Sequence, residues 1–251
     1  MLEVTNLSMR FGGLLAVDQV SLDVQEREIV SIIGPNGAGK TTVFNCMSGF
    51  YKPTGGKILL DGQEIQGKPD YRISRMGLVR TFQHVRLFGR MTVVENLLVA
   101  QHRHLNTNLL AGLISTPGYR ARERKAMDRA SYWLERVGLM DMANYEAGNL
   151  AYGQQRRLEI ARCMVTEPRL LMLDEPAAGL NPAETKELDQ LIISLKEDYN
   201  VSVVLIEHDM SVVMGISDRI NVISQGRPLA SGTPDEIRNN DDVIKAYLGE
   251  A

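Results

Sequence analysis

The sequence predicts an α/β fold built around a parallel β-sheet, and three stretches support this prediction. Residues 28–33 form an apolar run that leads into a glycine-rich loop, and residues 42–48 after the loop have a helical pattern. Residues 170–173 and 202–206 are two more apolar runs of strand length, and acidic residues follow each of them. In a parallel sheet covered by helices, ligands bind outside the carboxyl ends of the strands. The polar residues behind these strands are therefore candidates for one site.

The glycine-rich loop fits G-x-x-x-x-G-K-[ST], the pattern of a phosphate loop. Glycines let successive backbone N–H groups turn toward phosphate oxygens, and the N-terminus of the helix adds a favourable dipole. We expect Lys40 to reach the β- and γ-phosphates and the Thr41 hydroxyl to ligate Mg²⁺. A plain turn is the alternative, but the setting between a strand and a helix favours a nucleoside triphosphate site. The expected contact residues are Gly34, Pro35, Asn36, Gly37, Ala38, Gly39, Lys40, Thr41 and Thr42.

The composition is that of an ordinary globular protein, with 251 residues, 44% hydrophobic and 24% charged. A net charge of −3 argues against a general nucleic-acid binder, which usually carries a basic surplus. Cys46 and Cys163 lie on apolar helical patterns, so we expect buried, reduced thiols in a cytosolic protein. No apolar run approaches the length of a membrane span, and residues 1–4 do not resemble a signal peptide. Any membrane role is therefore expected to come through a partner.

The N-terminal third reads mostly as strands. Phe11 is a candidate platform for adenine because an aromatic face can stack on a base, although a core aromatic near a turn is an equal alternative. Gln83 ends an extended segment, and by itself it is better explained as an exposed loop residue. Strands are predicted at residues 2–9, 16–24, 57–60 and 63–65, a short helix at 71–75, and the extended segment at 78–83.

The middle of the chain is predicted to be helical. Thr92 and Glu95 have the spacing of a capping box for a helix over residues 92–101. Residues 102–117 are the least regular stretch, and His102 and His104 there read as surface residues. Residues 120–136 resume a helical pattern with mixed charges, which indicates a solvated helix face.

The last hundred residues contain further candidate site residues. Asp174 and Glu175 follow a predicted strand; we expect Asp174 in the Mg²⁺ shell and Glu175 to polarise the attacking water. His208 follows the next strand at the same edge, which favours a functional role over a structural one. Helices are predicted at 150–165, 182–197, 234–239 and 242–248, and a hairpin at 219–224 and 227–231.

Taken in order along the chain, these motifs resemble the nucleotide-binding subunit of ABC transporters. The resemblance implies an ABC-type ATPase core of the P-loop NTPase fold, with an antiparallel β subdomain and an inserted helical subdomain. The sheet core is expected at about residues 1–75 and 169–251, and the helical subdomain at about 76–168. The motifs are the loop at 34–42, Gln83, a signature at 150–154, Asp174 with Glu175, the turn at 178–181, and His208.

The resemblance also implies roles for these residues. ATP and Mg²⁺ are bound in a head-to-tail dimer, each nucleotide lying between the loop of one subunit and the signature of the other. Phe11 stacks on adenine, Gln83 senses Mg²⁺ and the membrane partner, and His208 holds the γ-phosphate and the water. Tyr152, Gly153 and Gln154 of the signature contact the opposite nucleotide, Gly153 at its γ-phosphate.

Three stretches resemble the ATPases of bacterial branched-chain amino acid importers: residues 80–83, 150–157 and 243–249. The extra segment at 102–122 resembles the longer of the two ATPases of such a system. The implied partners are a second ATPase, identical or different, two membrane permease subunits and a periplasmic amino-acid-binding protein. The implied location is the cytoplasmic face of the cell membrane. Importers of urea or amides, and a soluble ABC ATPase not tied to transport, remain alternatives.

Three residues depart from the broad family pattern. Ala151 stands where the signature usually has Ser, and Tyr152 where it has its first Gly. A hydroxyl contact to the opposite γ-phosphate is thereby missing, so we expect one composite site to be weaker. Asn181 replaces the usual Asp of the turn after Glu175.

Overall fold

The structure is a computed structural model that describes residues 1–101 and 117–248. The chain divides into two compact units, residues 1–83 with 168–251 and residues 84–167. The second unit begins later than the expected boundary at about residue 76, because β6 (Leu78–Arg80) pairs with β7 (Leu170–Asp174) in the first unit. Residues 102–116, which include His102, His104 and most of the extra segment, lie outside the described residues.

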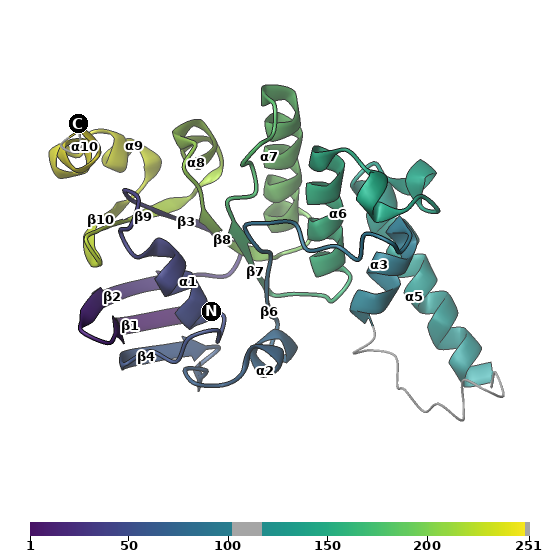
Figure 1. Cartoon of the computed structure of the whole chain (residues 1–251), viewed down its shortest axis with the longest axis horizontal. Helices are drawn as coiled ribbons and strands as arrows, with labels where there is room; N and C mark the ends of the chain where they lie inside the picture. The colour runs from purple at the N-terminus through teal and green to yellow at the C-terminus, as the bar shows by residue number, and fades with distance from the viewer. Residues whose placement is uncertain (102–116, 249–251) are drawn as a thin grey trace. The chain divides into compact units, whose positions relative to one another are not determined.

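The larger sheet of the first unit has six strands in the order β10-β9-β3-β8-β7-β6 (Figure 1). Neighbouring strands are parallel except for the β9–β10 hairpin. Strands β3, β7 and β8 are buried along their whole length, as in parallel sheets covered on both faces. Their carboxyl ends meet at one edge, where the predicted site residues follow. Besides β6 and β7, the strands of this sheet are β3 (Ile29–Ile33), β8 (Ser202–Ile206), β9 (Arg219–Ser224) and β10 (Arg227–Gly232).

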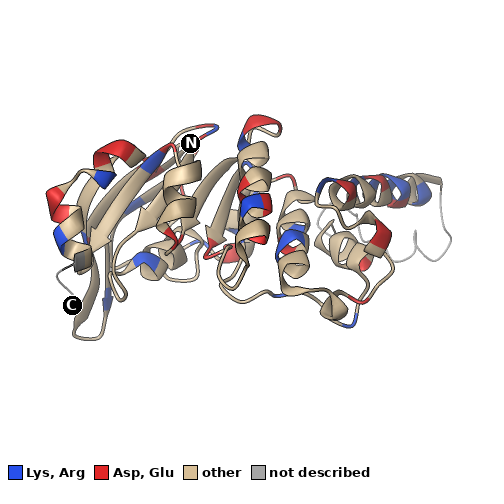
Figure 2. Cartoon of the chain, turned by 90° about the horizontal axis from the view of Figure 1, so that it is seen from above, with Lys and Arg blue, Asp and Glu red and all other residues tan. Residues whose placement is uncertain are grey.

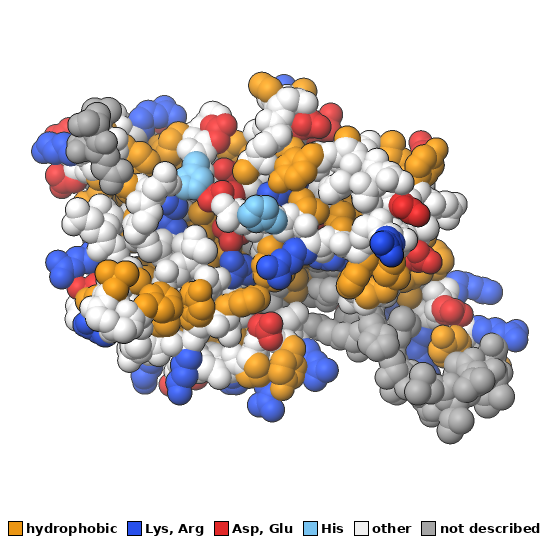
Figure 3. Space-filling view, viewed as in Figure 1, with side chains coloured by type: hydrophobic (Ala, Val, Ile, Leu, Met, Phe, Trp, Pro, Cys, Tyr) orange, Lys and Arg blue, Asp and Glu red, His pale blue; other side chains and the backbone are white. Residues whose placement is uncertain are grey.

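The smaller sheet is antiparallel, with the order β2-β1-β4-β5. Its buried residues share one core with α1 (Lys40–Met47) and with one face of the larger sheet, so α1 lies between the two sheets (Figure 1). Exposed apolar side chains, among them Phe11, Leu14 and Tyr51, gather where β1 turns into β2 (Figure 3). The strands are β1 (Leu2–Phe11), β2 (Leu14–Val24), β4 (Gly55–Leu60) and β5 (Gln63–Glu64).

The remaining helices of the first unit connect or cover the strands. Ile33 at the end of β3 packs in a second apolar cluster with residues of three of them, α8, α9 and α10. Helix α8 was not predicted: it has only seven residues, and Asp209 caps it by accepting the Ser211 N–H at 2.8 Å. The helices are α2 (Asp70–Arg75), α7 (Pro182–Glu197), α8 (Met210–Ile216), α9 (Pro234–Arg238) and α10 (Asp241–Leu248).

The second unit is helical where the structure describes it. Thr92 and Glu95 form the predicted capping box at the start of α3 (Val93–Ala100), which confirms that prediction. Helix α5 (Pro117–Arg136) buries a stripe at Ala126, Ala130, Trp133 and Leu134. Both signs of charge alternate along the rest of α5 (Figure 2), which fits the predicted solvated face. Two 3₁₀ turns, Met140–Met142 and Ala147–Asn149, lead to α6 (Tyr152–Met164).

The two cysteines are buried and free, as predicted. Burial raises the pKa of the Cys46 and Cys163 thiols to about 12, so neither is a thiolate at neutral pH. None of the helices in residues 1–101 and 117–248 has the length and apolar character of a membrane span.

Candidate active site

The loop between β3 and α1 uses glycines in backbone conformations that other residues rarely adopt. Gly34, Gly37 and Gly39 have φ angles of 151°, 77° and 98°. A Cβ on Gly34 would lie 1.9 Å from the carbonyl oxygen of Ile223, and one on Gly39 would lie 2.8 Å from that of Ala16. The loop can therefore close against β9 and β2 only with glycine at these two positions.

The turn between β9 and β10 braces this loop. The N–H of Gly226 donates to the carbonyl of Ala38 at 3.0 Å, and the Gly226 carbonyl accepts from the N–H of Asp18 at 2.8 Å. Within the described residues, no side chain caps the N-terminus of α1. The dipole of α1 favours an anion at this N-terminus.

Lys40 begins α1 and points back over the loop. Its Nζ donates to the carbonyl oxygens of Gly34 and Pro35 at 2.6 and 2.9 Å, and only 6% of the residue is exposed. The ammonium group is thus held by the backbone of the loop itself, which aims a positive charge at any phosphate that the loop encloses.

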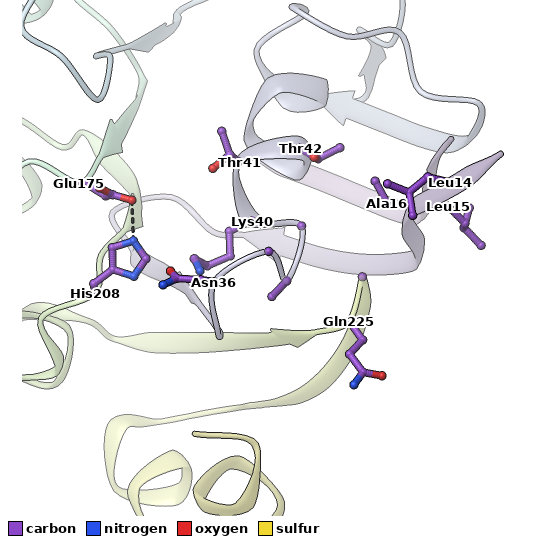
Figure 4. A pocket seen from close by; sticks show the side chains of 14 residues that line it. Leu14, Leu15, Ala16, Asn36, Lys40, Thr41, Thr42, Glu175, His208 and Gln225 are labelled. Atoms are coloured by element: carbon purple, nitrogen blue, oxygen red, sulfur yellow. Dashed lines mark hydrogen bonds and ion pairs between the residues drawn. The ribbon is translucent and has the colours of Figure 1, made fainter. Parts of the chain in front are cut away.

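A cavity of about 430 Å³ opens beside the loop, within the first unit (Figure 4). Lys40, Thr41 and Thr42 line it from α1, and Glu175 with His208 line it from the ends of β7 and β8. The structure thus brings together residues that lie more than 130 positions apart in the sequence. The full lining is Leu14, Leu15, Ala16, Asn36, Gly37, Ala38, Gly39, Lys40, Thr41, Thr42, Glu175, His208, Gln225 and Gly226.

Glu175 stands at the centre of a hydrogen-bond network at the strand ends. Its Oε1 lies 2.6 Å from Nε2 of His208, and its Oε2 accepts from Nε2 of Gln83 at 3.0 Å. An ionised carboxylate only accepts, so Nε2 of His208 carries the proton of this contact. The φ angle of Glu175 is 48°, unusual for a residue with a side chain and typical of active sites. Glu175 therefore contacts both His208 and Gln83, the two residues expected to act with it in catalysis from the family resemblance.

The three residues expected to ligate Mg²⁺ supply only oxygen donors. Thr41 lines the cavity, Gln83 contacts Glu175, and the Asp174 carboxylate is 5% exposed and pairs with Arg80. The described residues contain no group of three or more His, Cys, Asp or Glu side chains that could hold a metal. Mg²⁺ prefers hard oxygen ligands, keeps several waters and takes others from substrate phosphates, so this donor set fits it.

Sequence reasoning missed Arg80 as a site residue. Arg80 ends β6, and its position in the parallel ladder is opposite Met172 of β7, two residues before Asp174. Its Nη2 donates to Oδ2 of Asp174 at 2.8 Å. The signal in the sequence was a lone basic residue at the end of a short apolar strand, but only the sheet order identifies its partner.

Glu207 was a second residue without a predicted role. It is 4% exposed, and burial raises the pKa of its carboxyl group. Oε1 accepts the backbone N–H of Ala177 at 2.7 Å, and Oε2 accepts that of His208 at 3.0 Å. Glu207 therefore fixes the backbone on both sides of the Glu175–His208 pair.

The predicted signature residues belong to the second unit. Tyr152, Gly153 and Gln154 form the first turn of α6, and Gln154 Oε1 accepts the N–H of Ala151 at 3.1 Å. Ala151 occupies the N-cap position but has no side-chain acceptor. The Tyr152 side chain is exposed, and its ring lies 5.3 Å from the guanidinium of Arg156. The first turn of α6 thus presents an exposed tyrosine, whereas Gly153 is buried.

Asn181, the third residue that departs from the family pattern, is the N-cap of α7. Its Oδ1 accepts the N–H groups of Ala183 and Glu184 at 2.9 and 3.0 Å. Asn and Asp are about equally good N-caps, so the exchange keeps this helix start intact.

Phe11 does not line the cavity. Its ring packs edge-on against Tyr51, with 5.2 Å between centroids, and both side chains are partly exposed. Leu14, Leu15 and Ala16, just after the β1–β2 turn, line the cavity instead. Stacking of adenine on Phe11 stays a prediction.

The chain matches two family models. A model described as ABC transporter covers residues 17–178, and one described as branched-chain amino acid ATP-binding cassette transporter covers residues 227–251. A protein named high-affinity branched-chain amino acid transport ATP-binding protein LivG, from Salmonella typhimurium, is 68% identical over all 251 residues and 98% of its own length. The corresponding protein BraF of Pseudomonas aeruginosa is 69% identical over 250 residues, again 98% of its length.

Solved structures of ATP-binding cassettes have the same fold. MJ1267, the cassette of an ABC transporter in its ADP conformation, superposes with a TM-score of 0.86 at 30% identity, covering 99% of this chain and 98% of that one. The cassette MJ0796, a dimer bound to ADP and Pi in a post-hydrolysis state, superposes with a TM-score of 0.78 at 25% identity. The match covers 93% of this chain and 99% of that one.

Proposed function

The chain belongs to the ABC transporter family as an ATP-binding, ATP-hydrolysing protein, and on this basis we propose that it drives the import of branched-chain amino acids. Relatives of 67–69% identity along the whole chain carry that function in their names, and the C-terminal family match points to the same solutes. Leucine, isoleucine and valine are therefore the proposed solutes. The relatives described above are not named for urea or amide import, or for functions outside transport.

One observation supports the hydrolytic role most directly: Glu175 contacts both Gln83 and His208 at the rim of the phosphate-loop cavity. In the proposed reaction, Glu175 orients the attacking water and accepts its proton. His208, held against Glu175 through Nε2, holds the γ-phosphate and the water. A general base of this kind contributes about 10²–10⁴-fold to a rate.

The phosphate loop binds the triphosphate in this proposal. Backbone N–H groups of residues 34–42 and the N-terminus of α1 surround the phosphate oxygens. Lys40 exchanges its two contacts with loop carbonyls for contacts with the β- and γ-phosphates. The backbone N–H donors are already placed by the loop, so Lys40 is the donor that changes partners on binding.

Thr41, Asp174 and Gln83 are the residues proposed to hold Mg²⁺ through their side-chain oxygens. When bound, Mg²⁺ neutralises charge on the β- and γ-phosphates during transfer to water. Gln83 has two roles in this scheme: its amide N–H group contacts Glu175, and its amide oxygen is the proposed metal ligand.

We propose that two ATPase subunits close head to tail, as the family does. The signature residues Tyr152, Gly153 and Gln154 of one subunit would then contact the γ-phosphate bound by the loop of the other. The dimeric state of the solved cassette with ADP and Pi supports this arrangement. The second ATPase is either an identical chain or a different one.

The other proposed partners are two membrane permease subunits and, through them, a periplasmic amino-acid-binding protein. The chain would lie on the cytoplasmic face of the membrane, attached through the permeases. Closure of the dimer on ATP and reopening after hydrolysis would switch the permeases between outward and inward access.

The test is uptake by membranes that contain the native transporter complex. Membranes that lack this subunit should show no high-affinity uptake of labelled leucine, isoleucine and valine. Restoring the subunit should restore the uptake of all three. Uptake of urea and of an unrelated solute serves as the control. Intact uptake of the three amino acids with loss of urea uptake would assign the chain to a different importer.

A further inference from the structure

The guanidinium of Arg80 connects three parts of the active site through hydrogen bonds. Nη2 donates to Asp174 Oδ2 at 2.8 Å, and Nη1 donates to Asn45 Oδ1 at 2.6 Å and to Ser48 Oγ at 2.9 Å. Nε donates to the carbonyl of Thr81 at 3.2 Å. One planar group therefore joins the end of β7, the last turns of α1 and the segment that leads to Gln83.

Three aromatic rings enclose the same group. The guanidinium carbon lies 5.4 Å from the ring centroids of Phe44 and Phe50 and 5.6 Å from that of Phe82. Phe50 and Phe82 also meet edge to face at 5.7 Å. Aromatic faces attract a cation and exclude water, so the position of Arg80 is defined on several sides.

The ion pair between Arg80 and Asp174 is buried, with 9% and 5% of the two side chains exposed. A buried carboxylate that loses its partner is strongly unfavourable, so the rotamer of Asp174 depends on Arg80. The pair engages Oδ2 of Asp174 and leaves Oδ1 outside it. Oδ1 is therefore the oxygen that can serve the metal shell, directly or through a water.

We propose that Arg80 is a positioning residue for the Mg²⁺–nucleotide: it fixes which oxygen of Asp174 faces the metal and, through Phe82, holds the backbone that leads to Gln83. This inference rests on the proposed function, because the role of Asp174 toward Mg²⁺ belongs to that function. Partners behind a metal ligand orient it, and their mutation typically lowers metal affinity about 10–100-fold. A lysine cannot reproduce the fork, because its single nitrogen cannot replace both Nη1 and Nη2.

The competing explanation is that Arg80 only stabilises the fold. A structural role alone would lower thermal stability but leave the ratio of ATP affinities with and without Mg²⁺ unchanged. A positioning role changes that ratio even in a variant that remains folded. ATP binding without Mg²⁺ depends on the loop and Lys40, whereas the guanidinium of Arg80 donates to Asn45, Ser48, Thr81 and Asp174.

The experiment is calorimetric titration of ATP into the purified chain, in EDTA and in excess Mg²⁺, with Mn²⁺ binding by electron paramagnetic resonance as an independent readout. The variants are Arg80→Lys and, as a matched control, Arg219→Lys. Arg219 forks onto Asp23 and Glu28 away from the cavity. Affinity in EDTA should stay within about twofold for both variants. The Mg²⁺-dependent gain should fall about 10–100-fold in Arg80→Lys only.

An equal Mg²⁺-dependent gain in wild type, Arg80→Lys and Arg219→Lys would overturn the inference and leave the proposed function standing. No gain in wild type would overturn the proposed function and the inference with it. If Arg80→Lys does not fold, Asn45→Ala removes one anchor of the guanidinium and keeps the ion pair. This variant should lose several-fold of the Mg²⁺-dependent gain, and an unchanged gain in it would likewise overturn the inference.

Discussion

Nε2 of His208 lies 2.6 Å from Oε1 of Glu175, although the two residues follow different strands and are 33 positions apart in the sequence. The contact exists because β7 and β8 are neighbours in register, with Asp174 opposite Ile206. It aims the imidazole and the carboxylate at the same point of the cavity.

His208→Ala should slow hydrolysis without preventing ATP binding. The lost hydrogen bond to a charged group is worth about 1.5–3 kcal/mol, which corresponds to about 10–100-fold in rate. The measurement is single-turnover hydrolysis by the assembled ATPase pair. His208→Gln, whose amide can still donate, should retain more activity than His208→Ala. Equal rates for wild type and His208→Ala would remove His208 from the mechanism.

Lys40→Ala should weaken ATP binding at least about tenfold, because the charge-assisted bonds of its ammonium are lost. The fold should persist, since the loop conformation is set by Gly34 and Gly39 and by the brace at Gly226. Calorimetry with circular dichroism measures both properties. Lys57→Ala, an exposed lysine paired with Glu64, is the control and should bind as wild type. Unchanged affinity in folded Lys40→Ala would contradict the assignment of the phosphate site.

Ala151→Ser should have two separate effects. As an N-cap, serine supplies the acceptor that Ala151 lacks, so α6 and the isolated chain should gain about 0.5–2 kcal/mol in free energy of unfolding without nucleotide. In the dimer, the same hydroxyl should tighten ATP-driven closure by less than the 1.5–3 kcal/mol of a full charged hydrogen bond. Closure is measured by sedimentation with ATP. A large loss in Tyr152→Phe, with no gain in Ala151→Ser, would mean that the tyrosine hydroxyl already makes this contact.

Asp189 provides a test of pH dependence. Burial, together with Asp209 and Glu207, raises the pKa of Asp189 to about 6, and among the described residues its Oδ1 has no hydrogen-bond partner. The folded state binds the proton more tightly than the unfolded chain, so the stability that protonation supplies is lost as pH rises through about 6. Asp189→Asn should therefore be more stable than wild type at pH 8, and the difference should shrink toward pH 5.

Urea unfolding at the two pH values measures this difference, with the exposed Asp141→Asn as the control. A stability difference for Asp189→Asn that does not change with pH would show that the charge of Asp189 is not the cause. Asp189 does not line the nucleotide cavity, so ATP binding should be unaffected.

Much of the fold follows from local patterns in the sequence. Strand β8 and helix α7 begin and end where predicted, because a continuous apolar run and a Pro182 start after Asn181 define them without help from tertiary contacts. Helix α8 escaped prediction because seven residues with a glycine carry too little periodicity.

The sequence predicts a site residue only where that residue belongs to a motif or follows a recognisable strand. Gly34 and Lys40 belong to a motif, and Glu175 and His208 follow apolar strands. Arg80 and Glu207 have no such signal, because their importance comes from burial and from partners that the strand order brings close. Whether Phe11 lines the cavity also depends on tertiary structure. After the β1–β2 turn, Leu14, Leu15 and Ala16 line the cavity, while Phe11 packs against Tyr51.

The most direct test of the central claim is turnover by the Glu175→Gln variant in the complete transporter complex. Glutamine keeps the size of the side chain but cannot accept the proton of the attacking water. ATP should bind as in wild type, hydrolysis should fall about 10²–10⁴-fold, and leucine uptake should stop with the dimer closed on ATP. Hydrolysis and uptake within a few fold of wild type would contradict the account.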